Sequence, residues 1–263
     1  MSRRPKLGLV LGSGGLRGLA HVGVLSVLEE NGIEVDLVAG CSIGSLIGVL
    51  ICAGYDSDTI MKLAKGLGRG SWLELIINKK GFIGTENIYK IVTMLTKGRK
   101  IEELSKPFAA VATDLATGRE HVFRDGNSAA AVCASVAIPG IFVPYECDGR
   151  QLVDGAIVNP TPVSVARDMG ADVIVAVDLA AVSSIGEVKT VFDVILRSLD
   201  IMEKGLFSYQ RLINDCDILI QPELSSCAVT DFKKIEECYE VGRDAAWEML
   251  PNLLDILDNY SDK

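Results

Sequence analysis

Residues 40–44 read Gly40-Cys41-Ser42-Ile43-Gly44. An apolar run of strand length, residues 33–39, precedes this pentapeptide, and an apolar run compatible with a helix, residues 45–53, follows it. The pattern fits a nucleophile elbow, G-x-S-x-G, a sharp strand-to-helix turn that leaves a serine hydroxyl exposed. The same residues also fit a glycine-rich turn in which Ser42 only caps the helix. The pentapeptide alone leaves both interpretations open.

The sequence on both sides of the elbow alternates between strand-like and helix-like patterns. Strands are expected over residues 7–11, 35–39, 108–113, 120–123, 172–179 and 217–220. Helices are expected over residues 17–30, 43–53, 127–136 and 187–213, and an amphipathic helix or helix pair over 231–257, where Pro251 would kink or break it. Residues 56–100 are helical and looped in pattern. The alternation favours an α/β sandwich with a largely parallel sheet.

A glycine-rich loop, Gly12-Ser13-Gly14-Gly15-Leu16-Arg17-Gly18, follows the first expected strand and opens a helix. Backbone N–H groups at such a helix start bind negative charge, which could be a dinucleotide, a phosphate or the oxyanion of acyl transfer. A dinucleotide site fits poorly, because Arg17 stands where the third glycine belongs and Asp36 precedes the core of the second strand instead of ending it. No Gly-Lys-Ser/Thr follows, so a P-loop fails too.

An oxyanion site would need a serine nucleophile nearby. Two neighbouring parallel strands would bring this loop and Ser42 to the same edge of the sheet. A tight turn without a ligand is the alternative.

A serine nucleophile needs a base to accept its proton, and the sequence offers few. His121 is the one histidine after Ser42 and falls in an expected hairpin, whereas His21 is expected to pack inside the first helix. The Ser, Asp, late-His order of α/β-hydrolases is therefore not available. Asp-Gly, mainly a turn signal, occurs at Asp125, Asp148 and Asp154. Asp148-Gly149 fits a hairpin turn and Asp125-Gly126 a strand-to-helix link.

Asp154 differs, because it ends the short apolar strand 151–153 and leads into a loop. It could be held rigidly toward a neighbouring strand's elbow, so the residues permit a Ser–Asp dyad.

Length and composition set limits on the class of protein. The chain has 263 residues and a formal net charge of −9, which argues against generic binding to nucleic acid or to anionic membranes. Its seven cysteines are odd in number and none are spaced C-x-x-C, so neither a disulfide framework nor a zinc site is expected. Cys41 should point away from a substrate. We expect one domain over residues 1–263, with no metal and no cofactor.

The sequence also carries signals about location. No apolar run reaches the roughly 18 to 20 residues that span a bilayer, and the apolar run 7–11 is too short for a signal peptide, so a cytoplasmic protein is expected. Residues 62–100 hold nine Lys/Arg against Glu74 and Glu86, a charge of +7, and leave −16 for the remainder. Trp72 and other apolar residues interleave with Lys79 and Lys80 there. This segment could rest peripherally on anionic lipid or cover an acyl pocket, or it could be a core helix with a solvated basic face.

Taken together, these motifs resemble the patatin-like phospholipase family, particularly its small bacterial members. The resemblance covers about residues 6–180, with a helical part at about 185–263 that is less telling. It rests on the glycine loop with Arg17 and Gly18, the elbow continuing to Ser45, the segment 134–142 (ASVAIPGIF), and Asp154-Gly155-Ala156.

The resemblance implies a three-layer α/β/α fold and hydrolysis of acyl esters, often of phospholipids or lysophospholipids. It assigns Ser42 as nucleophile, Asp154 as base, and Gly40 and Gly44 as the elbow glycines. Gly155 and Ala156 complete a DGA motif, and the oxyanion loop would comprise Gly12, Gly14, Gly15, Arg17 and Gly18. Ser13 stands where many members have glycine, which concerns substrate preference more than catalysis.

The substrate would be a lipid or another acyl ester. A thioesterase or general carboxylesterase on the same dyad and a non-catalytic regulatory protein are the alternatives. The sequence gives no oligomeric state.

Overall fold

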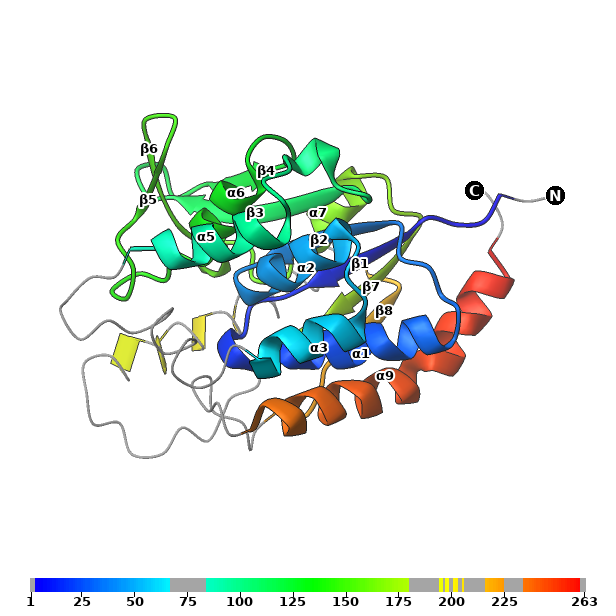
Figure 1. The fold of residues 1–263 in the computed structure, drawn as a ribbon. Coiled ribbons are helices and arrows are strands. Elements are labelled where there is room, and N and C mark those ends of the chain that lie inside the picture. Colours follow the sequence, from blue (N-terminus) through cyan, green and yellow to red (C-terminus); the bar gives the residue numbers. More distant parts are fainter. Residues whose placement is uncertain are drawn as a thin grey trace.

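The computed structural model describes residues 3–66, 84–179, 194–195, 197–198, 201–202, 205, 216–224 and 234–260 (Figure 1). Within these residues one sheet has the strand order β5-β6-β3-β2-β1-β7-β8, and β4 pairs with β3. The strands are β1 (Leu7–Leu11), β2 (Leu37–Cys41), β3 (Phe108–Asp114), β4 (Glu120–Phe123), β5 (Tyr145–Cys147), β6 (Arg150–Asp154), β7 (Val173–Val177) and β8 (Ile218–Ile220).

The centre of the sheet is parallel and one end is antiparallel. β3, β2, β1, β7 and β8 run parallel to one another, whereas β4 and β6 are antiparallel to β3 and β5 is antiparallel to β6. The predicted mainly parallel sheet is confirmed. β2 begins and ends two residues later than the expected 35–39, because its pairing with β1 continues to the Leu11–Gly40 pair.

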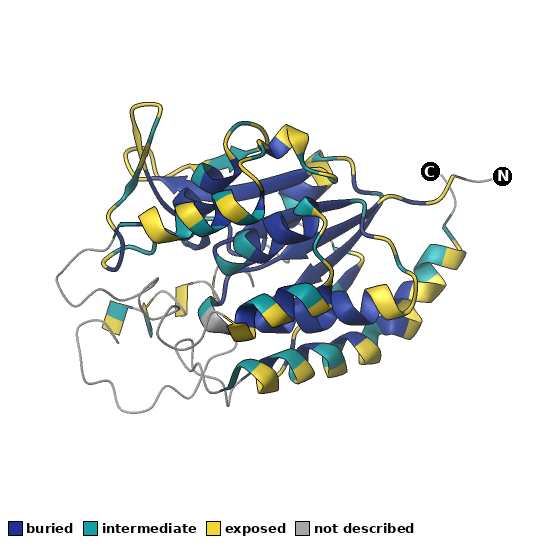
Figure 2. Ribbon diagram, viewed as in Figure 1, coloured by how far each residue is buried: buried dark blue, intermediate teal, exposed yellow. Residues whose placement is uncertain are grey.

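Helices cover both faces of the sheet. They are α1 (Leu19–Glu30), α2 (Ile43–Ala53), α3 (Ser57–Gly66), α5 (Glu86–Leu95), α6 (Ser128–Ser135), α7 (Val163–Asp168) and α9 (Ile235–Asp258), with short 3-10 turns η1 (Gly15–Gly18), η2 (Ile101–Glu103) and η3 (Gly155–Ile157). Leu7, Leu9 and Leu11 of β1 join an apolar cluster with α1, α2 and α9. Val10, on the opposite face, joins a second cluster with α7. This alternation produces the expected three layers, with buried strands between helices (Figure 2).

α9 is one continuous helix that contains Pro251, so the expected break into a helix pair does not occur. Leu250 and Leu253, on either side of Pro251, are both buried, so packing holds the helix against the body through the proline. The contact with α1 is backbone to backbone: a Cβ on Gly23 would lie 2.1 Å from the carbonyl oxygen of Tyr239. Most of the expected helix over 187–213 lies outside the described residues.

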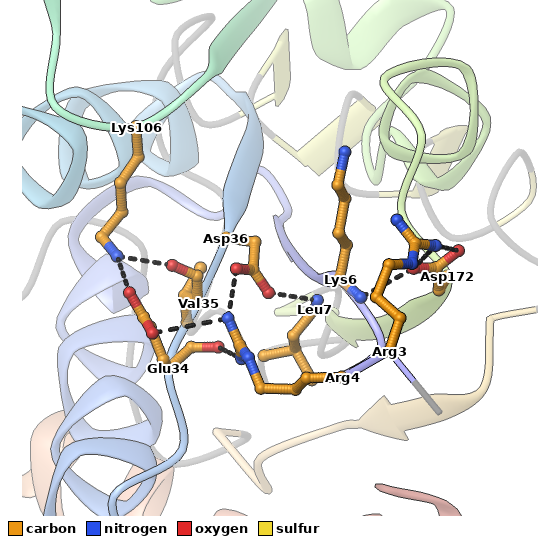
Figure 3. Close-up of polar contacts among 9 residues, drawn as sticks. All are labelled: Arg3, Arg4, Lys6, Leu7, Glu34, Val35, Asp36, Lys106 and Asp172. Carbon is orange, nitrogen blue, oxygen red and sulfur yellow. Dashed lines mark hydrogen bonds and ion pairs between the residues drawn. The ribbon is translucent and has the colours of Figure 1, made fainter. Parts of the chain in front are cut away.

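Ion pairs fix the amino ends of the central strands (Figure 3). The Asp36 carboxylate accepts a hydrogen bond from the Leu7 amide at 2.7 Å and pairs with Arg4. Asp172 accepts from the Lys6 amide at 2.8 Å and pairs with Arg3. Asp36 thus lies at the amino end of β2, where its carboxylate is bonded to backbone, whereas Ser42 follows the carboxyl end of β2. A dinucleotide site would need the acidic residue at the carboxyl end, so this placement argues further against such a site.

Candidate active site

The topology around β3 brings the elbow and Asp154 together. β2 pairs with β3 up to the Cys41–Val111 pair, and β6 pairs with β3 from the Ala112–Asp154 pair onward. β4 pairs with the same part of β3, residues 110–113, and a strand has two edges only. β2 and β6 must therefore share the other edge, where they meet end to end at neighbouring β3 residues. Ser42 follows the last residue of β2, and Asp154 is the last residue of β6.

Ser42 and Asp154 form a direct hydrogen bond. Ser42 Oγ donates to Asp154 Oδ2 at 2.6 Å, and both side chains are buried. Ser42 has φ 53° and ψ −124°, a backbone conformation that residues other than glycine rarely adopt. Strain of this kind persists where the surrounding structure holds it, and it is a recognised feature of the nucleophile elbow. Ser42 also precedes α2, but its side chain makes no capping hydrogen bond, so the capping interpretation is wrong.

Burial dominates the electrostatics of Asp154. Removal from water raises the pKa of this carboxyl from 3.8 to about 6, although hydrogen bonds from Ser42 and from the Ala156 amide act to lower it. The Ala156 N–H donates to Oδ1 at 2.9 Å and so fixes the carboxylate with its other oxygen toward Ser42. A carboxyl with a pKa near 6 is ionised at neutral pH and is a better proton acceptor than an exposed aspartate.

The glycines of the two motifs allow backbones to touch. A Cβ on Gly40 would lie 2.5 Å from the Gly44 carbonyl oxygen, and one on Gly44 would lie 2.0 Å from that of Leu11. A Cβ on Gly155 would lie 2.3 Å from the Val111 carbonyl oxygen. No side chain fits at these distances, so the elbow, β1 and the Asp154 turn can approach only through glycine.

The glycine loop offers fewer amide donors than its sequence suggests. The Gly12 N–H donates to the Val177 carbonyl at 3.0 Å, as part of the pairing of the loop base with β7. Arg17 is buried, and its Nε and backbone N–H both donate to the Gly14 carbonyl, at 3.1 and 3.3 Å. In the described part of the chain, the N–H groups of Gly14 and Gly15 donate no hydrogen bond. These two amides start the 3-10 turn that leads into α1 and can bind an anion.

Gly18 has a packing role in the same loop. A Cβ there would lie 2.1 Å from the Ile43 side chain, in the first turn of α2. Its lack of a side chain lets the start of α1 lie against the start of the elbow helix.

The structure adds a residue that the sequence analysis did not single out. Ser135, at the end of α6, is buried and its Oγ accepts the Ser42 N–H at 2.9 Å. It lies within the segment 134–142 noted above, but no local pattern marked its hydroxyl. Cys41 is also buried. Its Sγ lies 3.9 Å from Asp154 Oδ1, whereas Ser42 Oγ is bonded to the other carboxylate oxygen, Oδ2.

Among the described residues, no hydrogen bond joins either histidine to the dyad. His21 is buried in α1, as expected, and its Nε2 lies 2.8 Å from the Gly12 carbonyl oxygen. His121, on β4, has its Nδ1 3.2 Å from Arg150. Of the basic stretch, residues 67–83, including Trp72, Lys79 and Lys80, lie outside the described residues. Among the described residues, no helix combines the length and apolar character that crossing a bilayer requires.

Comparison with known proteins identifies the family of this chain. Residues 9–167 match the family model described as patatin-like phospholipase, a span well over half of the chain. The chain belongs to the patatin-like phospholipase family.

Individual relatives support the same assignment. The uncharacterized NTE family protein Rv1063c of Mycobacterium tuberculosis is 40% identical over 181 residues, covering 68% of this chain and 50% of that protein. Patatin-like phospholipase domain-containing protein 7 of Mus musculus is 35% identical over 185 residues, covering 66% of this chain and 14% of that protein. The chain thus spans half or less of the length of these relatives. The solved structure of VipD from Legionella pneumophila shares the fold, with a TM-score of 0.57 at 14% identity over 95% of this chain and 67% of VipD.

Proposed function

We propose that this chain is a serine acyl hydrolase with Ser42 as nucleophile and Asp154 as base. Its substrates are lipids, either phospholipids or lysophospholipids, and it cleaves their carboxylic ester bonds. The observation that carries the proposal is the 2.6 Å hydrogen bond from Ser42 Oγ to Asp154 Oδ2 at a strained strand-to-helix turn. Membership in the patatin-like phospholipase family supports the choice of lipid esters.

The first half of the reaction forms an acyl-enzyme. Ser42 Oγ attacks the ester carbonyl carbon while its proton moves to Asp154 Oδ2. The carbonyl oxygen becomes an oxyanion, which the amides of Gly14 and Gly15 stabilise. Collapse of this tetrahedral intermediate breaks the bond to the alcohol, which leaves with the proton from Asp154.

The second half releases the acid. Asp154 accepts a proton from water, the resulting hydroxide attacks the acyl carbon, and the same amides hold the second oxyanion. The ester of Ser42 breaks, and Asp154 returns the proton to Ser42 Oγ. Removing one oxyanion donor typically costs about 3 to 4 kcal/mol of transition-state stabilisation, so these amides would carry a large part of the catalysis.

Covalent labelling tests the nucleophile. Wild type, Ser42→Ala and Ser105→Ala would be treated with a fluorophosphonate and measured by intact mass. Ser105 is a matched control because its hydroxyl binds the Cys52 carbonyl, away from the elbow. We expect one adduct on wild type and on Ser105→Ala and none on Ser42→Ala. A wild type that takes no adduct would refute the hydrolase and favour a non-catalytic protein.

A substrate panel tests the ester class. Phosphatidylcholine, lysophosphatidylcholine, a short p-nitrophenyl ester and an acyl thioester would be compared, with Ser42→Ala as blank. Fatty acid release from the phospholipids that depends on Ser42 is the expected result. Turnover confined to the thioester or to the short ester would overturn the lipid assignment while leaving the dyad in place.

A further inference from the structure

The peptide between Gly12 and Ser13, where the glycine loop leaves β1, is bonded through both its carbonyl oxygen and its N–H. The Gly12 carbonyl oxygen lies 2.8 Å from His21 Nε2. The Ser13 N–H donates to the Pro160 carbonyl at 2.9 Å, in the loop that follows Asp154. Together with the Gly12–Val177 bond, these contacts tie the base of the loop to α1, to β7 and to the turn after Asp154.

His21 is the hydrogen-bond donor in this contact. A carbonyl oxygen accepts, so Nε2 must carry the proton and donate. Nδ1 is buried and has no hydrogen-bond partner among the described residues. Burial lowers the pKa of the imidazole to about 4. The hydrogen bond to Gly12 acts to raise this pKa, but its effect is smaller. His21 is therefore neutral near pH 7 and acts as a fixed hydrogen-bond donor.

The carbonyl that His21 holds also touches the elbow. A Cβ on Gly44 would lie 2.7 Å from the Gly12 oxygen, so this oxygen lies between the imidazole and the first turn of α2. The amides of Gly14 and Gly15 come two and three residues later in the chain. The tilt of the Gly12–Ser13 peptide therefore sets where these amides lie relative to Ser42.

We propose that His21 is a positioning residue for the oxyanion hole, holding the Gly12 carbonyl so that the Gly14 and Gly15 amides stay aligned with Ser42 Oγ. The inference rests on the proposed function. His21 touches no reacting atom. Its loss would move donors that act mainly in the transition state, so kcat should fall while KM stays unchanged.

The length of the donor side chain provides the decisive comparison. Glutamine can place an amide N–H near the position of His21 Nε2, whereas asparagine is too short to reach the Gly12 oxygen. We expect His21→Gln to keep kcat within a few-fold of wild type and His21→Asn to lower it by about 10- to 100-fold, with KM within about twofold for both. Ser26→Ala is the matched control, since Ser26 is buried on the same helix and its hydroxyl bonds the Gly23 carbonyl at 2.7 Å, away from the loop.

Backbone amide NMR gives a readout that does not depend on turnover. The Gly14 and Gly15 amide signals should shift or broaden in His21→Asn and remain near their wild-type positions in His21→Gln and Ser26→Ala. All rates would be measured well below each variant's unfolding temperature. His21→Asn with wild-type kcat, or equal losses in both His21 variants, would overturn the inference. If wild type turns over no faster than Ser42→Ala, the proposed function itself fails, and the amide signals still decide whether His21 positions the loop.

Discussion

Asp154→Asn should make the protein more stable at neutral pH. The substitution keeps the shape of the side chain and replaces a buried carboxylate by a neutral amide. Asparagine Oδ1 can still accept the Ala156 N–H, which Asp154 accepts at 2.9 Å. The amide nitrogen would face Ser42 Oγ, which can accept a hydrogen bond from it. The main change is therefore the removal of a negative charge that burial disfavours.

The shift in the Asp154 pKa gives the magnitude and the sign. The pKa rises from 3.8 in the unfolded chain to about 6 in the fold. Below pH 3.8 the group is protonated in both states and its ionisation costs the fold nothing. Above pH 6 it is ionised in both, and the native state bears a penalty of ~3 kcal/mol, about 2.2 units at 1.36 kcal/mol each. Asp154→Asn should therefore match wild type near pH 4 and exceed it by up to ~3 kcal/mol near pH 8.

Urea unfolding of both proteins from pH 4 to pH 8.5 measures this difference. Asp114→Asn is a matched control on the neighbouring strand. Hydrogen bonds from the Thr117 and Ala116 amides outweigh burial there and lower the pKa of Asp114, so its ionised form stabilises the fold and the substitution should destabilise at pH 8. A stability difference for Asp154→Asn that is independent of pH, or that favours wild type at pH 8, would refute the reasoning.

Three further predictions follow from the same site. The kcat/KM of wild type on an ester should rise with pH and level off above an apparent pKa of about 6, because Asp154 must be ionised to accept the Ser42 proton; a pH profile on a fixed substrate, flat from pH 5 to pH 8, would contradict this. His21, with its pKa lowered from 6.5 to about 4, should cost the fold nothing above pH 6.5 and up to ~3 kcal/mol as the pH falls to 4, because the unfolded chain binds the proton first; urea unfolding of His21→Gln should lack this dependence. Gly44→Ala, whose Cβ would lie 2.0 Å from the Leu11 carbonyl oxygen, should lower stability by about 1 to 3 kcal/mol and reduce fluorophosphonate labelling. Gly66→Ala, with nothing within 4 Å, should leave both unchanged.

Local patterns carried much of the fold. The apolar runs at residues 7–11, 43–53 and 108–113 appear as β1, α2 and most of β3, because strand and helix periodicity depend on near neighbours in the chain. The 24-residue α9 shows the limit of such rules. Pro251 predicts a kink or a break, and the break does not occur, because the burial of Leu250 and Leu253 holds the helix on both sides of the proline. Tertiary packing outweighed a local preference there.

The sequence by itself determined the chemistry that is available: a serine in an elbow pattern, no late histidine, and one Asp-Gly at the end of a strand. Only the tertiary structure decided that these residues meet. Ser42 and Asp154 are 112 residues apart, and their contact depends on β2 and β6 sharing one edge of β3. The structure also decided which loop amides remain for an anion, since the Gly12 N–H goes to Val177 while those of Gly14 and Gly15 stay open among the described residues. Strand pairing and hydrogen-bond partners are long-range choices, set by the packing of the whole sheet, and no local pattern specifies them.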